Sequence, residues 1–267
     1  MPQAVQTLPA GHYRVKHVVR SEIVKMATLP STAITVGVTI VLSLLVTGLV
    51  TNNAALHHGP GFYIDATQRA LTGLIVAGLT AGVFGALLIT GEYSSGTIRT
   101  TLAATPKRPV LLAAKIGVTT AATVVFFELL SFVSFFLGEA ILSGGGANSA
   151  SLASPGALRA VLMTGLFIAL LALMSFGFGL IFRSTAGAIA AFVGVVFVLP
   201  LVMHGISEPD VRYLPTEILV NSIMATTAQG PGGIIQELSP TAGLLLMFLY
   251  AAIALAAGAV LFMRRDA

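Results

Sequence analysis

The sequence predicts an all-α membrane protein with six transmembrane helices, and its composition and its apolar runs are the observations that predict it. Of the 267 residues, 56% are hydrophobic and only 9% are charged, and the mean hydropathy is +0.95. Soluble domains carry roughly 25% charged residues, so this chain could not cover the surface of a water-soluble fold. Six apolar stretches reach the length, about 20 residues, that a helix needs to cross the hydrocarbon core.

The six apolar stretches form one transmembrane domain, 30–263, between an N-terminal segment, 1–29, and a tail, 264–267. The first stretch begins about thirty residues into the chain and lacks a small-residue cleavage site, so we expect an anchor rather than a signal peptide. The expected spans are 30–50, 69–90, 116–142, 158–182, 186–204 and 241–263. Glycines on the second and fourth spans permit close helix packing; they are Gly73, Gly78, Gly82, Gly85, Gly177 and Gly179.

Basic residues lie almost entirely on one side of the predicted domain. Six spans place both termini on that side, where the loops and termini carry 11 of the 14 Lys and Arg residues. These are Arg14, Lys16, Arg20, Lys25, Arg99, Lys107, Arg108, Lys115, Arg183, Arg264 and Arg265. By the positive-inside rule this side is cytoplasmic. We therefore expect a multi-pass protein of the cell membrane with cytoplasmic N- and C-termini.

The segment before the first span predicts an amphipathic helix that lies in the membrane interface. Its apolar residues recur at helical spacing; they are Val15, Val18, Val19, Ile23 and Met26. Basic residues occupy the remaining faces, which favours attraction to anionic lipid. Glu22 falls on the apolar stripe, where a carboxylate is costly unless it is paired. The simpler alternative is a juxtamembrane anchor with no further role.

The loop between the second and third spans predicts a short helix that projects into the cytoplasm. Ser94 and Ser95 can cap its N-terminus, and Ile98 and Leu102 lie four residues apart on one face. The Thr105-Pro106 pair ends it. A solvated connector is the simpler interpretation, but a connector does not require this mixture of small, hydroxyl and apolar residues.

With these two segments the sequence resembles the permease subunits of type-2 ATP-binding-cassette exporters. The resemblance rests on the six-span layout, on the segment Ser21-Glu22-Ile23-Val24-Lys25, and on loop residues. The loop residues are Glu92, Gly96, Thr97, Leu102, Pro106, Arg108 and Lys115. The resemblance implies that the N-terminal helix is a connecting helix, that the loop helix docks on an ATPase subunit, and that the 205–240 loop forms a re-entrant outer segment.

The resemblance also implies partners and site residues. The coupling residues would be Glu92, Ser95, Gly96, Thr97, Ile98, Arg99 and Leu102, and those of the connecting helix Glu22 and Lys25. Glu92 and Arg99 are the candidates for polar contacts at the ATPase junction. The partners would be two copies of a separate ABC ATPase, a second permease copy in a homodimer, and membrane lipid, with no nucleic acid. We expect an ATP-driven exporter of a hydrophobic or amphipathic substrate such as a drug, lipid or peptide.

Motifs for catalysis are missing from the sequence. A Gly-x-x-x-x-Gly-Lys-Ser/Thr phosphate loop is absent, so ATP and Mg²⁺ are expected in the partner subunit and this chain is not expected to be an enzyme. The Gly91-Glu-Tyr-Ser-Ser-Gly segment misses the nucleophile elbow by one residue. The histidines, His12, His17, His57, His58 and His204, are too scattered for a metal site. We expect neither a bound cofactor nor a metal.

Two acidic residues interrupt the third span. Glu128 and Glu139 lie on one helix face, about 16 Å apart along the axis. Because a carboxylate in hydrocarbon is costly, this face, with Phe132 and Phe135, is a candidate translocation path, although a structural acid bonded to a neighbouring helix is equally compatible. A proton-coupled carrier that uses Glu128 is one alternative function, although no internal repeat supports it. A non-transporting immunity or sensor subunit is another.

Overall fold

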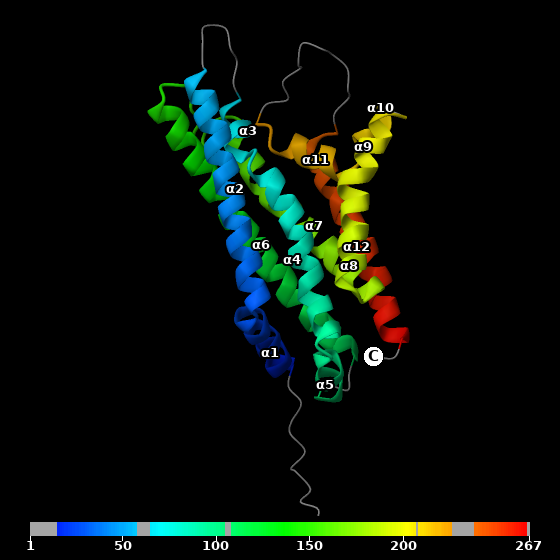
Figure 1. Ribbon diagram of the computed structural model, residues 1–267. Helices are drawn as coiled ribbons and strands as arrows, with labels where there is room; N and C mark the ends of the chain where they lie inside the picture. Colours follow the sequence, from blue (N-terminus) through cyan, green and yellow to red (C-terminus); the bar gives the residue numbers. More distant parts are fainter. Residues whose placement is uncertain (1–14, 58–64, 105–107, 207, 226–237, 266–267) are drawn as a thin grey trace, which may run out of the picture.

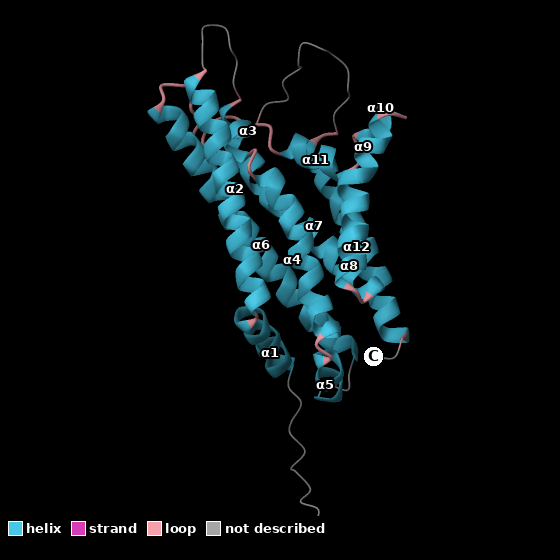
Figure 2. Ribbon diagram, viewed as in Figure 1, coloured by secondary structure: helices cyan, strands magenta, loops and turns pink. Residues whose placement is uncertain are grey.

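The computed structural model describes residues 15–57, 65–104, 108–206, 208–225 and 238–265, and helices joined by short turns account for most of them (Figures 1 and 2). No strand occurs within these ranges. Six helical segments are long and apolar enough to cross a membrane. The all-α prediction with six spans is therefore confirmed.

The helices follow the predicted order. The long elements are α2 (Pro30–Leu56), α4 (Leu74–Ser94), α6 (Arg108–Gly144), α7 (Ala157–Phe182) and α12 (Pro240–Arg264). The fifth span combines α8 (Thr185–Val193), the π-helical turn η1 (Gly194–Val198) and α9 (Leu199–His204). The short helices are α1 (Val15–Thr28), α3 (Ala66–Leu71), α5 (Thr97–Ala104), α10 (Glu208–Val211) and α11 (Pro215–Ser222).

Two long elements differ from the predicted bounds. The third span begins at Arg108 rather than Ile116, because α6 continues past the apolar run toward α1 and α5. The second span consists of α3 and α4 with a break at Thr72 and Gly73. A side chain at Gly73 would overlap the backbone of Ser43 in α2, so the break lies where two helices touch.

Helix α7 is the centre of the bundle and packs against α4, α6, α8, α11 and α12. Glycines make the closest of these approaches possible. Gly85 of α4 lies on the backbone of Ala172, and a Cβ at Gly177 would be 2.6 Å from the carbonyl carbon of Ala254 in α12. The predicted close packing at the span glycines is confirmed.

Replacing Gly85 with alanine is expected to destabilise the protein by about 1–3 kcal/mol, because the added methyl group overlaps the Ala172 carbonyl. The matched control is Gly37→Ala in α2, where no atom lies within 4 Å of the added carbon. This control should be neutral or stabilising, since alanine favours helix over glycine. Thermal unfolding in detergent measures both; equal melting temperatures would contradict the close α4–α7 contact.

Helix α2 has polar residues on its inner face and apolar residues on its outer face, the reverse of a helix in a soluble protein. Its inward stripe is formed by hydroxyl residues, each at most 1% exposed: Thr39, Ser43, Thr47 and Thr51. Its outward face carries large apolar residues: Ile34, Val38, Val41, Leu45 and Leu49. Thr39 and Thr51 donate to the carbonyl groups one turn earlier in their own helix, so their burial leaves those hydroxyls satisfied. This arrangement is suited to a lipid surrounding.

The segment before the last span packs into the end of the bundle opposite α1 and α5 (Figure 1). Ile218 and Leu219 of α11 are 2% and 1% exposed. The hydroxyl group of Thr216 donates to the carbonyl of Val196 in η1, where π-helical geometry interrupts the regular hydrogen bonds. The chain thus turns back toward the core here, and the re-entrant course within a bilayer stays a prediction.

Candidate coupling site

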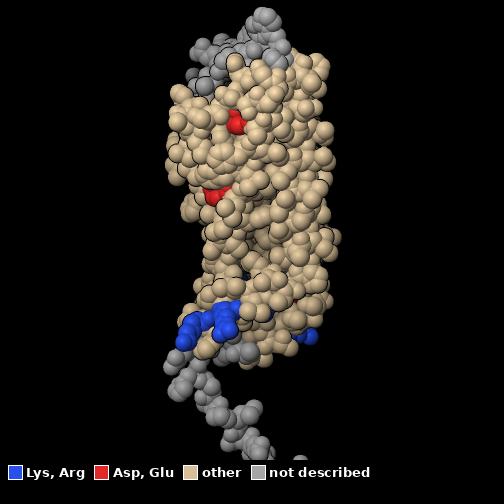
Figure 3. Space-filling model, turned by 90° about the vertical axis from the view of Figure 1, so that its left-hand side faces the viewer, with Lys and Arg blue, Asp and Glu red and all other residues tan. Residues whose placement is uncertain are grey.

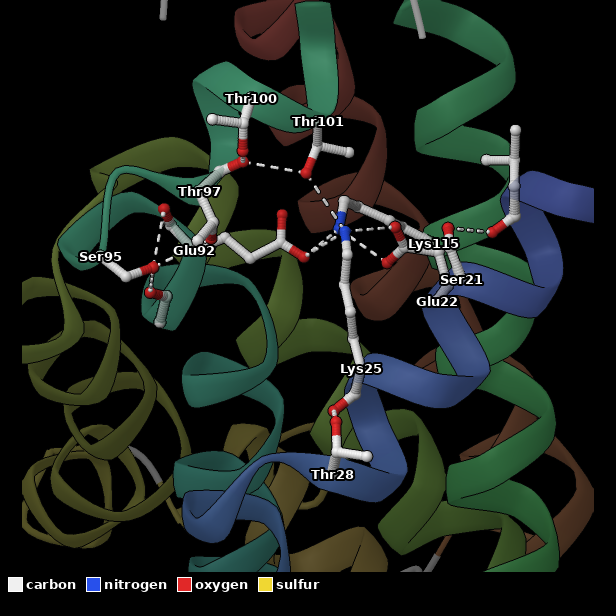
Figure 4. Close-up of polar contacts among 12 residues, drawn as sticks. Ser21, Glu22, Lys25, Thr28, Glu92, Ser95, Thr97, Thr100, Thr101 and Lys115 are labelled. Atoms are coloured by element: carbon white, nitrogen blue, oxygen red, sulfur yellow. Dashed lines mark hydrogen bonds and ion pairs between the residues drawn. The ribbon is translucent and has the colours of Figure 1, made fainter. Parts of the chain in front are cut away.

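Four charged side chains meet at the end of the bundle where α1 and α5 lie (Figure 4). We call Glu22, Lys25, Glu92 and Lys115 the four-charge cluster. Lys115 Nζ of α6 lies 2.7 Å from Glu22 Oε2 of α1 and also pairs with Glu92 Oε1 of α4. Lys25 Nζ of α1 lies 2.9 Å from Glu22 Oε1 and 3.3 Å from Glu92 Oε1. The cluster therefore joins three helices through two acids and two bases.

Three members of the cluster are buried. Lys115 is 3% exposed, and Glu22 and Glu92 are 7% exposed. A buried ion costs several kcal/mol unless oppositely charged groups surround it, and here the formal charges cancel. Glu22 thus has the partners that its place on the apolar stripe required. Each member depends on the others, because removing one leaves an unpaired buried charge.

Lys25 lies at the rim of the cluster, where its side chain is about a third exposed. Burial by itself would lower its pKa. The hydrogen bond to Glu22 and the negative charges of Glu92 and Glu22 outweigh burial, so the pKa of Lys25 is raised above its usual value. Lys25 therefore remains a cation throughout the neutral pH range.

Helix α5 is fastened to the cluster and to the apolar residues beneath it. Lys25 Nζ donates to Thr101 Oγ1 at 3.2 Å. Ile98 is 2% exposed and packs in what we call the basal apolar cluster. That cluster consists of Val18, Ile89, Ile98, Leu111, Leu112, Ala114, Phe176, Leu180 and Phe262. Helix α5 thus bonds to α1 through Lys25 and packs in a cluster to which α1, α4, α6, α7 and α12 all contribute.

The turn before α5 needs a glycine. Gly96 has a φ of +71°, a conformation that costs little only without a Cβ. Ser95 Oγ and Thr97 Oγ1 lie 2.9 Å apart across this turn. The turn lets α5 fold back beside the end of α4, with its other face open to solvent.

The predicted coupling residues fall into two groups. Ser95, Gly96, Thr97 and Arg99 are exposed, and Leu102 is half-buried against the basal apolar cluster. Glu92 and Ile98 face the interior instead. Neither can be a direct contact with another subunit in this conformation, because Glu92 is occupied by lysines of its own chain and Ile98 by apolar side chains. Ile98 anchors α5 through its inner face, and Glu92 lies at the end of α4 within the four-charge cluster.

Lys115 is the member of the four-charge cluster whose role was hardest to predict from the sequence. It entered only through the count of cytoplasmic basic residues and the family resemblance, since a single lysine at the start of an apolar run is also typical of an interfacial anchor. The available signal was the unpaired Glu22, which required a cation that the sequence alone could not identify. Thr101 gave no signal.

The candidate path residues lie in different surroundings in the described part of the chain. Glu139 is buried and accepts a hydrogen bond from the backbone N–H of Ala150 in the following loop. Phe135 is 1% exposed in the central core, and Phe132 packs at the edge of that core. Glu128 lies against Gly165 of α7, where a Cβ would be 2.7 Å from its carboxyl carbon. Their role in a path stays a prediction.

The comparisons with known proteins agree with this architecture. The family described as ABC-2 family transporter protein matches residues 50–267, a range that includes the last five spans, Glu92, α5 and Lys115. A comparison with curated proteins finds no match. Since the family match covers most of the sequence, the chain belongs to the ABC-2 transporter family and is a multi-pass membrane permease of an ABC transporter.

Proposed function

We propose that this permease exports a hydrophobic or amphipathic substrate with energy from ATP hydrolysed in a separate subunit. Family membership implies association with an ABC ATPase. The observation that carries the proposal is the attachment of α5, whose outer face is exposed while its inner face is bonded to the four-charge cluster. In this proposal two ATPase copies serve a homodimer of permeases, and ATP and Mg²⁺ bind in the ATPase.

The proposed mechanism depends on contact at both faces of α5. An element can bias the inward-open and outward-open states only if it interacts differently with the protein in each. The exposed residues Thr97, Arg99 and Thr100 would meet the ATPase. Movement of α5 would then reach α1 and α6 through Lys25 and Lys115. The connecting helix thus acts as a lever.

The proposed orientation has α5 in the cytoplasm of the cell. Helix α1, α5 and the end of α12 lie at one end of the bundle (Figure 1). The described basic residues counted for the positive-inside rule belong to α1, α5, the start of α6, the turn after α7 and the end of α12. Both termini would accordingly be cytoplasmic in the cell membrane.

Reversing the charge of Arg99 is expected to weaken binding of the ATPase by at least tenfold, because the side chain is exposed on the proposed docking face. The matched control is Arg264→Glu, which makes the same charge change at an exposed position at the end of α12. Binding and ATPase rates of the reconstituted complex measure both variants. Equal effects of the two would remove the docking assignment.

Transport driven by a proton gradient without any ATPase would instead favour the carrier that uses Glu128. Loss of that transport in a Glu128→Gln variant would identify Glu128 as the residue that carries the proton. A complex that hydrolyses ATP but moves no substrate would favour the sensor or immunity subunit. Each result contradicts ATP-driven export in a different way.

A further inference from the structure

A large apolar groove lies between α1, α2 and α6, next to the four-charge cluster, and Met26 and Val118 contact both. Its volume is about 1170 Å³, above the roughly 300–1,000 Å³ of ordinary small-molecule pockets. Its lining includes Val19 and Ile23 of α1, Val36 of α2, and Val118 and Phe126 of α6. The groove is apolar over nearly its whole length, so it suits a hydrocarbon ligand.

The groove opens sideways toward the surrounding lipid. Ile34 of α2 and the lining residues Val125 and Leu129 of α6 are about 60% exposed or more. Such side chains face acyl chains in a six-span membrane protein. An acyl chain can therefore enter from the bilayer without crossing a polar surface.

The rim of the groove is cationic. Lys16 and Arg20 are exposed and neighbour the lining residues Val15 and Val19 along α1. Figure 3 looks onto this side of the molecule, where basic side chains gather at the lower end and the surface above them is uncharged apart from isolated acidic side chains. An apolar channel that ends at cations matches a lipid with an anionic headgroup.

Charge also argues against a second copy of the chain as the occupant. Among described residues at this end, the carboxylates are Glu22 and Glu92, and both are buried in the four-charge cluster. In a symmetric contact through this groove, Lys16 and Arg20 of each copy would need carboxylates of the other copy, and the described residues at this end expose none. An anionic phospholipid offers the missing charge.

We propose that this groove binds an anionic phospholipid of the leaflet that faces α1 and α5, with an acyl chain along α6 and the headgroup phosphate at Lys16 and Arg20. One face of α1 would then contact the lipid while the adjacent face carries Glu22 and Lys25. The bound lipid would stabilise the position of α1, and, if the proposed function holds, it would tune coupling to the ATPase.

The chain contains no tryptophan, so a single introduced tryptophan reports its own surroundings. In the Phe126→Trp variant, reconstituted in phosphatidylcholine vesicles, brominated phosphatidylglycerol should quench the fluorescence at a mole fraction roughly 25-fold lower than brominated phosphatidylcholine, because two cations contribute. The preference follows from a contribution of about fivefold for each cation near an anionic headgroup. Phe248→Trp, at a 61% exposed position of α12, should show no preference.

Two sets of variants test the cause of the preference. Lys16→Ala with Arg20→Ala should abolish it, whereas Arg264→Ala should retain it. Gly117→Leu should reduce quenching by both lipids because it fills the groove, and Gly37→Leu should not; neither glycine has an atom within 4 Å of an added Cβ, so both variants should fold.

This test of lipid binding does not depend on the proposed coupling to the ATPase, because quenching measures only the binding of lipid in the groove. Equal quenching of Phe126→Trp by the two lipids would overturn the proposal, as would a preference that survives loss of both cations. The chain also lacks cysteine. Efficient disulfide formation between two copies through Val118→Cys would show that a second copy occupies the groove instead.

Discussion

Replacing Glu92 with leucine is expected to destabilise the folded permease by about 3–5 kcal/mol, because Lys115 then keeps its charge in a buried site with one carboxylate fewer. For a domain of this size the melting temperature should fall by roughly 10 °C. Thermal unfolding in detergent measures the change. Loss of this one side chain should also loosen α1, since Lys25 approaches the same carboxylate.

A double variant separates pairing from packing. Replacing both Glu92 and Lys115 with leucine and methionine removes one charge of each sign, so it should recover much of the stability lost in the single variant. Glu217→Ala is the matched control, because its ion pair with His204 is partly exposed and should be worth less than about 1 kcal/mol. Strictly additive effects of the two cluster substitutions would show that the charges do not act together.

Replacing Ile98 with alanine is expected to release α5 while leaving the six spans folded. The buried side chain loses its packing in the basal apolar cluster, at a cost of about 2–5 kcal/mol. Because α5 has only eight residues, it cannot remain helical without this support. Hydrogen exchange of residues 97–104 should accelerate by more than tenfold, and stimulation of the ATPase should be lost.

The control for this variant is Thr100→Ala, which changes an exposed position of the same helix and slightly favours helix formation. Its exchange rates should match those of the unchanged protein. If Ile98→Ala exchanged no faster than this control, α5 would not depend on the basal apolar cluster for its position.

The spans could be predicted because the bilayer imposes a one-dimensional requirement. Any chain segment that crosses it must be long and apolar, and that property is visible in the sequence. The need of Glu22 for a partner was visible for a related reason, since its place on one helix determines its face. Properties that depend on a single helix could therefore be predicted from the sequence.

Contacts between helices could not be predicted from the sequence. Lys115 is separated from Glu22 by 93 residues, and their meeting depends on how α1 crosses α6. The inward direction of Glu92 likewise depends on the lysines that surround it, because the sequence alone gave it the appearance of a surface residue in a polar loop. The break at Gly73 and the π-helical turn in the fifth span arise from packing against α2 and α11.

The arrangement of α2, with hydroxyl residues inside and apolar residues outside, has a consequence for engineering. In the hydroxyl stripe, Thr39 and Thr51 donate to carbonyl groups of α2, and Thr47 donates to the carbonyl of Ala70 in α3, so these three hydroxyls are bonded within the protein. A water-soluble version of the protein would require new polar residues only at outward positions such as Leu45 and Leu49. The bilayer thus determines which residue types occupy the outer face of this helix, while close helix contact determines which residue types occupy the inner face.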